Sequence, residues 1–167
     1  VVQKITKDAV GLGRMVFAHD EVSPDMRASH RKLGVSVSEF PMTLDTARSA
    51  IDADEAVILG APNVLRGGTQ NNAVDAEPAI TAGLCTALAS DYYYPAPLLA
   101  AFLLSARGGI GFPQAWQLVS SAPAQAAGLQ DRGVLCTGRR ADIVVVNPKT
   151  RLVRATFVAG RKVYERE

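Results

Sequence analysis

Four short apolar runs, each ending abruptly in polar or turn-forming residues, most constrain what this chain can fold into. The runs cover residues 14–18, 35–38, 56–59 and 85–89. A short apolar run bounded by turn residues is typical of a buried parallel strand. Helical stretches of about ten to fifteen residues separate the runs, which is the pattern of repeated βαβ units. The sequence therefore predicts an α/β fold with a parallel sheet.

Helix boundaries and the tail complete the predicted organisation. Ser23 is the expected N-cap of a helix that opens with Pro24 and stops at Gly34. Residues 1–9 resemble the end of a helix, and further helices are expected over 44–53, 74–81, 97–106, 113–120 and 123–127, with a loop over 60–73. Strands are predicted over 141–148, 152–159 and 162–164. We expect a parallel unit over residues 1–132 and a small antiparallel β-module over 133–167.

Composition excludes several classes of protein. The 167 residues are 48% hydrophobic and 20% charged, which suits a globular domain and argues against disorder. The net charge is +2 with scattered basic residues, so no nucleic-acid partner is expected. No apolar run is long enough to span a membrane. Cys85 and Cys136 lack metal-binding spacing and are expected to be reduced thiols. The expected location is the cytoplasm.

Acidic and imidazole groups follow two of the predicted strands. Polar residues just past the carboxyl ends of parallel strands carry the chemistry of barrels and open α/β sheets. His19 is either a metal ligand or a histidine satisfied by the backbone. Asp20 or Glu21 either orients its imidazole or is solvated. Asp91 is a metal ligand, a general base, or the N-cap of a helix that begins after Pro95.

The segment after the third strand is rich in glycine and asparagine. Arg66 with Gly67 and Gly68 either binds phosphate oxygens or forms an exposed flexible loop. Asn63 is either a substrate ligand or a turn residue. Glu39 closes a predicted buried strand, where a carboxylate is costly unless it is paired, so a functional role is favoured.

Four aromatic residues and a second histidine have structural interpretations that need no catalytic role. Tyr92, Tyr93 and Tyr94 form either a wall of the site or an amphipathic rim. Trp116 lies on an apolar helix and is expected in the core. His30 lies beside Arg31 and Lys32 on a predicted helix and is expected at the surface.

Several motifs, in order and with similar spacing, resemble the phosphonate-metabolism diphosphatases of the amidohydrolase superfamily, the M component of the carbon–phosphorus lyase pathway. The specific motifs are Glu39-Phe40-Pro41 and the stretch from Gly60 to Gly68. Residues 18–21 and 90–93 also match, and the tail motifs 122–129, 131–133 and 138–142 are shared by many members of the superfamily. The resemblance implies the C-terminal half of a metal-dependent (β/α)8 barrel of the TIM type, plus the small β-module.

The resemblance also implies an activity and residue roles. The reaction would be hydrolysis of α-D-ribose 1-methylphosphonate 5-triphosphate, a small phosphorylated substrate, to the 5-phosphate and pyrophosphate. His19 and Asp91 would match metal positions on the fifth and eighth strands, with a divalent ion, zinc by expectation. Asp91 would also act as general base, whereas Glu39, Asn63 and Arg66 would lie on the sixth and seventh strands. Together with Gly67 and Gly68, these three form the predicted substrate-binding set.

Three departures from the family pattern concern the metal site and the length. The sixth-strand histidine of many relatives is replaced near Met42-Thr43, and residues 69–72 replace a loop that contains a histidine. The first four strands have no counterpart, and 167 residues cannot close a barrel of about 250 residues. We therefore expect the C-terminal part of a longer protein. It would pair with the missing N-terminal half, form a homo-oligomer across open sheet edges, or aggregate.

Two alternatives stay open. A cyclic amidohydrolase of the dihydroorotase or hydantoinase type would act on C–N bonds, with Pro62, Asn63 and Arg66 gripping the substrate. A fragment without enzymatic activity would serve only as an assembly surface.

Overall fold

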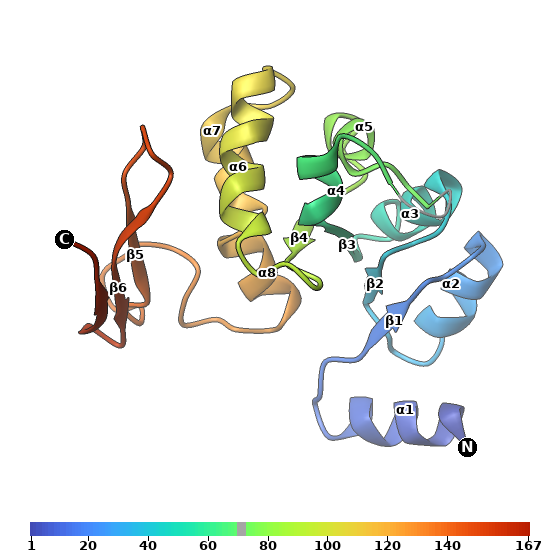
Figure 1. Ribbon diagram of the computed structural model, residues 1–167. Helices are drawn as coiled ribbons and strands as arrows, with labels where there is room; N and C mark the ends of the chain where they lie inside the picture. The colour runs from blue at the N-terminus through green and yellow to red at the C-terminus, as the bar shows by residue number, and fades with distance from the viewer. Residues whose placement is uncertain (70–72) are drawn as a thin grey trace.

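The computed structural model describes residues 1–69 and 73–167, and its centre is a parallel sheet of four strands (Figure 1). The strands follow the chain order β1-β2-β3-β4 and cover Phe17–His19, Val37–Glu39, Ala56–Gly60 and Ala87–Ala89. The helices are α1 Val2–Gly11, α2 Pro24–Arg31, α3 Leu44–Ile51, α4 Ala61–Arg66, α5 Ala76–Thr81, α6 Ala96–Arg107, α7 Phe112–Gln117 and α8 Ser121–Ala126. None of the helices in the described ranges is both long and apolar enough to cross a membrane.

Strand register places the carboxyl ends of all four strands along one rim. His19 pairs with Glu39, and Glu39 with Ile58. Side chains alternate between the faces of a strand, so neighbouring residues pack in different clusters. Val57 packs in the main cluster with residues of α3 to α7. Ile58 packs in a second cluster on the opposite face of the sheet, together with Ala126 of α8.

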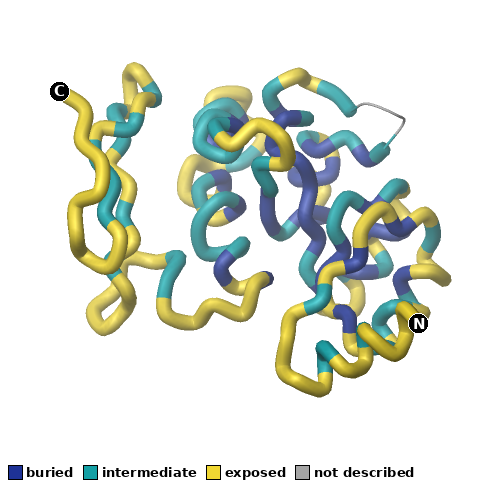
Figure 2. Tube along the Cα trace, turned by 60° about the horizontal axis from the view of Figure 1, so that its bottom comes forward, coloured by how far each residue is buried: buried dark blue, intermediate teal, exposed yellow. Residues whose placement is uncertain are grey.

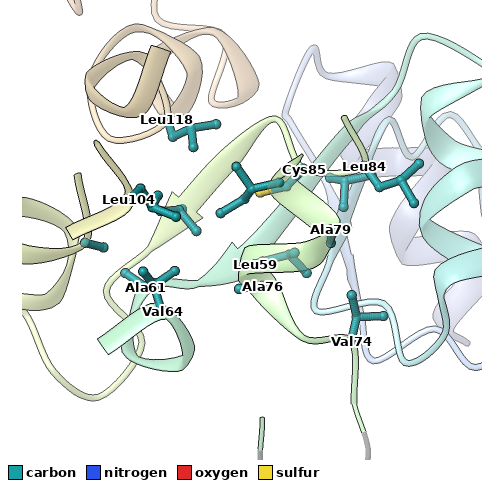
Figure 3. Packing of buried hydrophobic residues seen from close by; sticks show 14 of the residues in the cluster. Leu59, Ala61, Val64, Val74, Ala76, Ala79, Leu84, Cys85, Leu104 and Leu118 are labelled. Carbon is teal, nitrogen blue, oxygen red and sulfur yellow. The ribbon is translucent and has the colours of Figure 1, made fainter. Parts of the chain in front are cut away.

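The main core lies between the sheet and its helices and is built largely from small residues (Figure 3). Leu59 and Leu88 of the sheet meet Val64 of α4 and Leu104 of α6 there, and each of them is at most 4% exposed. Burial raises the pKa of the Cys85 thiol to about 12, so this thiol stays uncharged and acts as a small apolar group. As predicted, both cysteines are free.

One edge of the sheet is covered and the other is more open. On β4 the amide of Leu88 donates to the carbonyl of Leu118, 2.8 Å away, so the segment after α7 pairs with this edge. On β1, Phe17 is 38% exposed, and the preceding Met15 is 45% exposed. The expectation of two open edges therefore holds only for the β1 side.

A second sheet is antiparallel, with the order β5-β6-β7 over Ile143–Val146, Val153–Val158 and Arg161–Glu165. It lies beside α6 and α7, and exposed residues line most of it (Figures 1 and 2). The turn between β6 and β7 uses Ala159 and Gly160 with φ of 50° and 78°. The architecture has the predicted parallel and antiparallel parts, while the boundary at residues 132 and 133 stays a prediction.

A group of four charged residues fastens the segment before β5 to the β6–β7 turn. Arg132 contacts Asp131 at 2.8 Å and Asp142 at 3.3 Å, and Arg140 contacts Asp142 at 2.8 Å. Asp142 also accepts a hydrogen bond of 2.8 Å from the amide of Ala159. This backbone donor and then the Arg140 guanidinium hold the pKa of Asp142 below its ordinary value.

Replacing Asp142 by asparagine is expected to lower the melting temperature at pH 7. The carboxyl has a lower pKa in the folded chain than in the unfolded chain. Its contribution is therefore present above the unfolded pKa of about 3.9 and is lost as pH falls through the folded value. Because asparagine resembles the protonated acid, the difference in Tm between the two proteins should shrink from pH 4 downward. A difference independent of pH would contradict this account.

Several sequence predictions differ from the structure in detail. Five strands are shorter than predicted, and β1 begins at Phe17 rather than Arg14, whereas β3 and β7 are slightly longer than predicted. The predicted loop over 60–73 contains helix α4, and its residues 70–72 lie outside the described part. Trp116 is only partly buried, although it packs against the core as expected. Ser23 caps α2 as predicted and accepts a hydrogen bond from the amide of Met26.

Candidate functional site

The rim at the carboxyl ends of the strands is marked by unusual backbone geometry. Asp20, Phe40 and Asp91 have φ of 57°, 52° and 50°, and each lies one or two residues past a strand. This left-handed region is uncommon for residues other than glycine, asparagine and aspartate, and such geometry clusters at functional sites. Backbone bonds hold the turns: the amide of Asp20 donates to Glu39, and that of Phe40 to Ile58.

His19 ends β1 with its ring partly exposed. Its Nδ1 lies 2.8 Å from a carboxylate oxygen of Asp20, and its side chain is 53% exposed. Phe40 holds the ring edge-on at a centroid distance of 5.0 Å. When Nδ1–H donates to a carboxylate, Nε2 carries the free lone pair, which is the form that binds metal ions. Of the two carboxylates considered from the sequence, Asp20 is the one that contacts this imidazole.

Glu21 turns away from the rim and is completely buried beneath α2. It accepts hydrogen bonds from Arg27 at 3.1 Å and from the hydroxyl of Ser38. His30 lies 2.7 Å from the other carboxylate oxygen and has a side chain only 30% exposed. The predictions that Glu21 orients His19 or is solvated are therefore wrong, and the predicted surface exposure of His30 holds only in part, because its ring contacts the buried Glu21. The sequence gives no period or motif that reveals this contact across nine residues.

Arg66 lies at the end of α4, where its guanidinium reaches two neutral side chains. It donates to the amide oxygen of Asn63 at 2.6 Å and to the hydroxyl of Tyr92, whose ring centroid lies 5.9 Å from its Cζ. Helix α4 ends because Gly67 adopts φ of 74°, a left-handed cap that favours glycine. The structure thus brings Asn63 and Arg66 together and adds Tyr92, which was predicted only as part of a wall or rim.

The partners of Arg66 distinguish it from three other arginines of the parallel unit. Arg27, Arg31 and Arg107 each contact a carboxylate. Within residues 1–69 and 73–167, the guanidinium of Arg66 contacts an amide and a phenol only. No side chain in the described part of the structure therefore neutralises its positive charge, which suits an anionic ligand.

Gly67 and Gly68 leave the approach to this guanidinium open. A methyl group added at either glycine would meet no atom of the described residues within 4 Å. Their amides already donate to the carbonyl of Asn63 at 3.0 and 3.2 Å. The residues can therefore give a ligand room at the rim, while their backbone donors are occupied in this arrangement.

Asp91 occupies an exposed turn after β4. The amide of Tyr93 donates to the carbonyl of Ser90 at 3.0 Å, which places Asp91 at the second position of that turn. The N-cap of α6 is Pro95, so the capping alternative for Asp91 is wrong. Because β1 and β4 are the two edges of the sheet, β2 and β3 separate Asp91 from His19. Their convergence on one ion stays a prediction.

The residues fit a metal only in part. The His19–Asp20 pair has the chemistry of a ligand with its orienting carboxylate. Glu39 lies next to His19 in register and is half-buried. However, no group of three or more histidine, cysteine, aspartate or glutamate residues in the described ranges is placed to hold an ion. Catalytic zinc sites use about three protein ligands.

Comparison with known proteins places these residues in context. No family model matches the chain. The chain is 39% identical over 152 residues to the α-D-ribose 1-methylphosphonate 5-triphosphate diphosphatase of Escherichia coli strain K12. That alignment covers 88% of this chain and 40% of the relative, so the chain spans about two fifths of the relative's length.

Solved structures share the fold at low sequence identity. An amidohydrolase from Thermotoga maritima superposes with a TM-score of 0.71 and 20% identity over 91% of this chain and 44% of its own. An N-acetylglucosamine-6-phosphate deacetylase from Pasteurella multocida superposes with a TM-score of 0.74 and 13% identity over 96% of this chain and 53% of its own. The resemblance is therefore confirmed: over most of its length the chain is similar to the phosphonate-metabolism diphosphatase, and it has the fold of about half of an amidohydrolase.

Proposed function

We propose that this chain forms part of a metal-dependent hydrolase that cleaves α-D-ribose 1-methylphosphonate 5-triphosphate to the 5-phosphate and pyrophosphate. The observation that carries the proposal is Arg66, a guanidinium at the strand rim whose partners among the described residues are two neutral side chains. A triphosphate offers the anionic oxygens that such a group binds as a fork. The similarity to the E. coli diphosphatase supports this substrate.

Each residue has a distinct part in the proposed reaction. When bound, a divalent ion polarises a phosphoryl oxygen and lowers the pKa of a water. His19 offers Nε2 as a ligand, and Asp20 fixes its tautomer from the other side of the ring. Asp91 accepts the proton of the attacking water. Arg66 stabilises charge on the leaving pyrophosphate, and Gly67 and Gly68 leave room for it.

The proposed ion is zinc, and one copy of this chain supplies only part of its ligand set. His19 and Asp91 supply two ligands, and the others come either from a second copy of this chain or from an N-terminal half of the complete gene product. The alignment to two fifths of the relative supports the second source. Glu39, Asn63 and Arg66 form the proposed substrate-binding set. The proposed location is the cytoplasm.

The activity test uses the complete gene product and the triphosphate substrate. The expected products are pyrophosphate and the ribose 5-phosphate in equal amounts, with turnover lost after chelation and restored by Zn²⁺. Dihydroorotate and hydantoins serve as comparison substrates. Ring opening without pyrophosphate release would favour a cyclic amidohydrolase, and absence of both reactions would favour an assembly role.

Asp20→Asn is expected to weaken zinc binding by about 10–100-fold, because the charged partner of the His19 imidazole is lost. Affinity is measured by competition with a chromophoric chelator. Asp54→Asn is the matched control, since Asp54 is also exposed, also has φ of 57°, and precedes β3 at the opposite end of the sheet. Equal zinc affinities in all three proteins would contradict the role of the His19–Asp20 pair.

A further inference from the structure

Tyr92 is an exposed residue that nonetheless has a defined partner. It is 68% exposed, and its hydroxyl accepts a hydrogen bond from one terminal nitrogen of Arg66, while the other terminal nitrogen donates to Asn63. Exposed arginine side chains lose much conformational freedom when they bind a ligand. A side chain that is already held from two sides loses less. The two contacts therefore pre-organise the Arg66 guanidinium in the unbound protein.

The two partners of Arg66 come from different parts of the rim. Asn63 belongs to α4, the same helix as Arg66, whereas Tyr92 belongs to the turn after β4. That turn is built by the bond from Tyr93 to Ser90 and by the left-handed conformation of Asp91. Tyr92 thus links the segment after β3 to the segment after β4, and it follows directly in sequence the proposed proton acceptor.

We propose that Tyr92 is a positioning residue, which orients the Arg66 guanidinium for a diphosphate group and is itself not required to touch that group. This inference rests on the proposed function. Arginine has five N–H donors, and the contacts with Tyr92 and Asn63 use two of them, so three remain for phosphate oxygens. Both partners are neutral, so they direct the fork without cancelling its charge.

The neighbouring tyrosine provides a matched control. Tyr94 is 87% exposed and lies two residues further along the same segment. Its phenol is chemically identical to that of Tyr92, and the hydrogen bond to Arg66 belongs to Tyr92. Removing one hydroxyl at a time therefore separates a positioned contact from a general effect of phenols at the rim.

The test measures binding of inorganic pyrophosphate by calorimetry to the complete gene product, after chelation so that no metal contributes. Tyr92→Phe is expected to weaken binding about tenfold, which corresponds to one oriented hydrogen bond. Tyr94→Phe is expected to leave the affinity unchanged, and the melting temperatures should be equal. In an Arg66→Ala background, Tyr92→Phe should have no further effect, since the hydroxyl acts through the guanidinium.

The outcomes separate this inference from the proposed function. If Arg66→Ala weakens binding but Tyr92→Phe does not, the positioning role is wrong and the proposed function stands. If Tyr92→Phe weakens binding equally with and without Arg66, the hydroxyl acts directly and the positioning role is also wrong. If wild type and Arg66→Ala bind pyrophosphate alike, or neither binds it, Arg66 is not the anion site. The positioning role of Tyr92 and the proposed diphosphatase function are then both unsupported by this contact.

Discussion

Replacing Asp91 by asparagine is expected to reduce pyrophosphate release by about 10²–10⁴-fold, the usual contribution of a positioned general base. The reason is chemical rather than structural. Asparagine cannot accept a proton from water, but it tolerates the left-handed backbone that Asp91 adopts at φ of 50°. The turnover number of the complete gene product is measured under saturating substrate, together with thermal unfolding, which should be unchanged.

Two further variants make the Asp91 result specific. Asp91→Gly removes the carboxylate and relieves any cost of the positive φ, so it should also lose turnover while folding at least as well. Asp54→Asn makes the same chemical change at an exposed aspartate with φ of 57° away from the rim and should retain activity. Near-normal turnover in Asp91→Asn would refute the proposed role.

Replacing Arg27 by methionine is expected to lower the free energy of unfolding by about 3–5 kcal/mol, the cost of breaking a buried ion pair from one side. Arg27 and Glu21 are both 0% exposed. Arg27 also donates to the carbonyls of Val35 and Val37, so its loss leaves two buried acceptors without this donor. Methionine keeps most of the volume, which separates the charge from the packing.

The network extends from Arg27 to Glu55, which directly precedes β3. Its Nε lies 3.2 Å from a carboxylate oxygen of Glu55, although the direction does not satisfy hydrogen-bond geometry, so this contact is electrostatic. Arg31 makes two hydrogen bonds of 2.8 Å to the same carboxylate, which raises the pKa of Arg31 and keeps it charged. Removing Arg27 therefore affects Glu21 more than Glu55.

Urea denaturation of the chain measures this effect. Arg48→Met is the control, because Arg48 lies exposed on α3 and surface substitutions usually change stability by less than about 0.5 kcal/mol. Equal denaturation midpoints for Arg27→Met and wild type would mean that the buried pair contributes no net stability here. A midpoint shift of similar size in Arg48→Met would instead indicate a general loss of positive charge.

The order of elements was predictable because local signals agree with the fold. Apolar runs, Ser23 with Pro24, and the prolines near the starts of α6, α7 and α8 each mark a boundary by their own chemistry. Helix α4 was missed because its Pro62, Asn63 and closing glycine are also typical of turns.

The contacts within the site were predictable only in part. The strand ends were expected to align, and register places His19 next to Glu39. Contacts that bridge separate segments, such as Arg66 with Tyr92 and Glu21 with His30, depend on side-chain direction after two different elements have packed. A single sequence contains no periodic signal for such pairs. The contact of Glu21 with His30 nevertheless accompanies the burial of Glu21, which leaves Asp20 as the carboxylate beside His19 at the rim.

The small-residue core limits how this protein can change over evolutionary time. Among the described residues, nine alanines have 0% exposure, all of them in the helices that pack around the sheet. A close-packed interior has no space for an added methyl group without a matching loss on the facing side chain. Descendants of this sequence should therefore vary freely on the outer helix faces, whereas the inner faces should change only in compensating pairs.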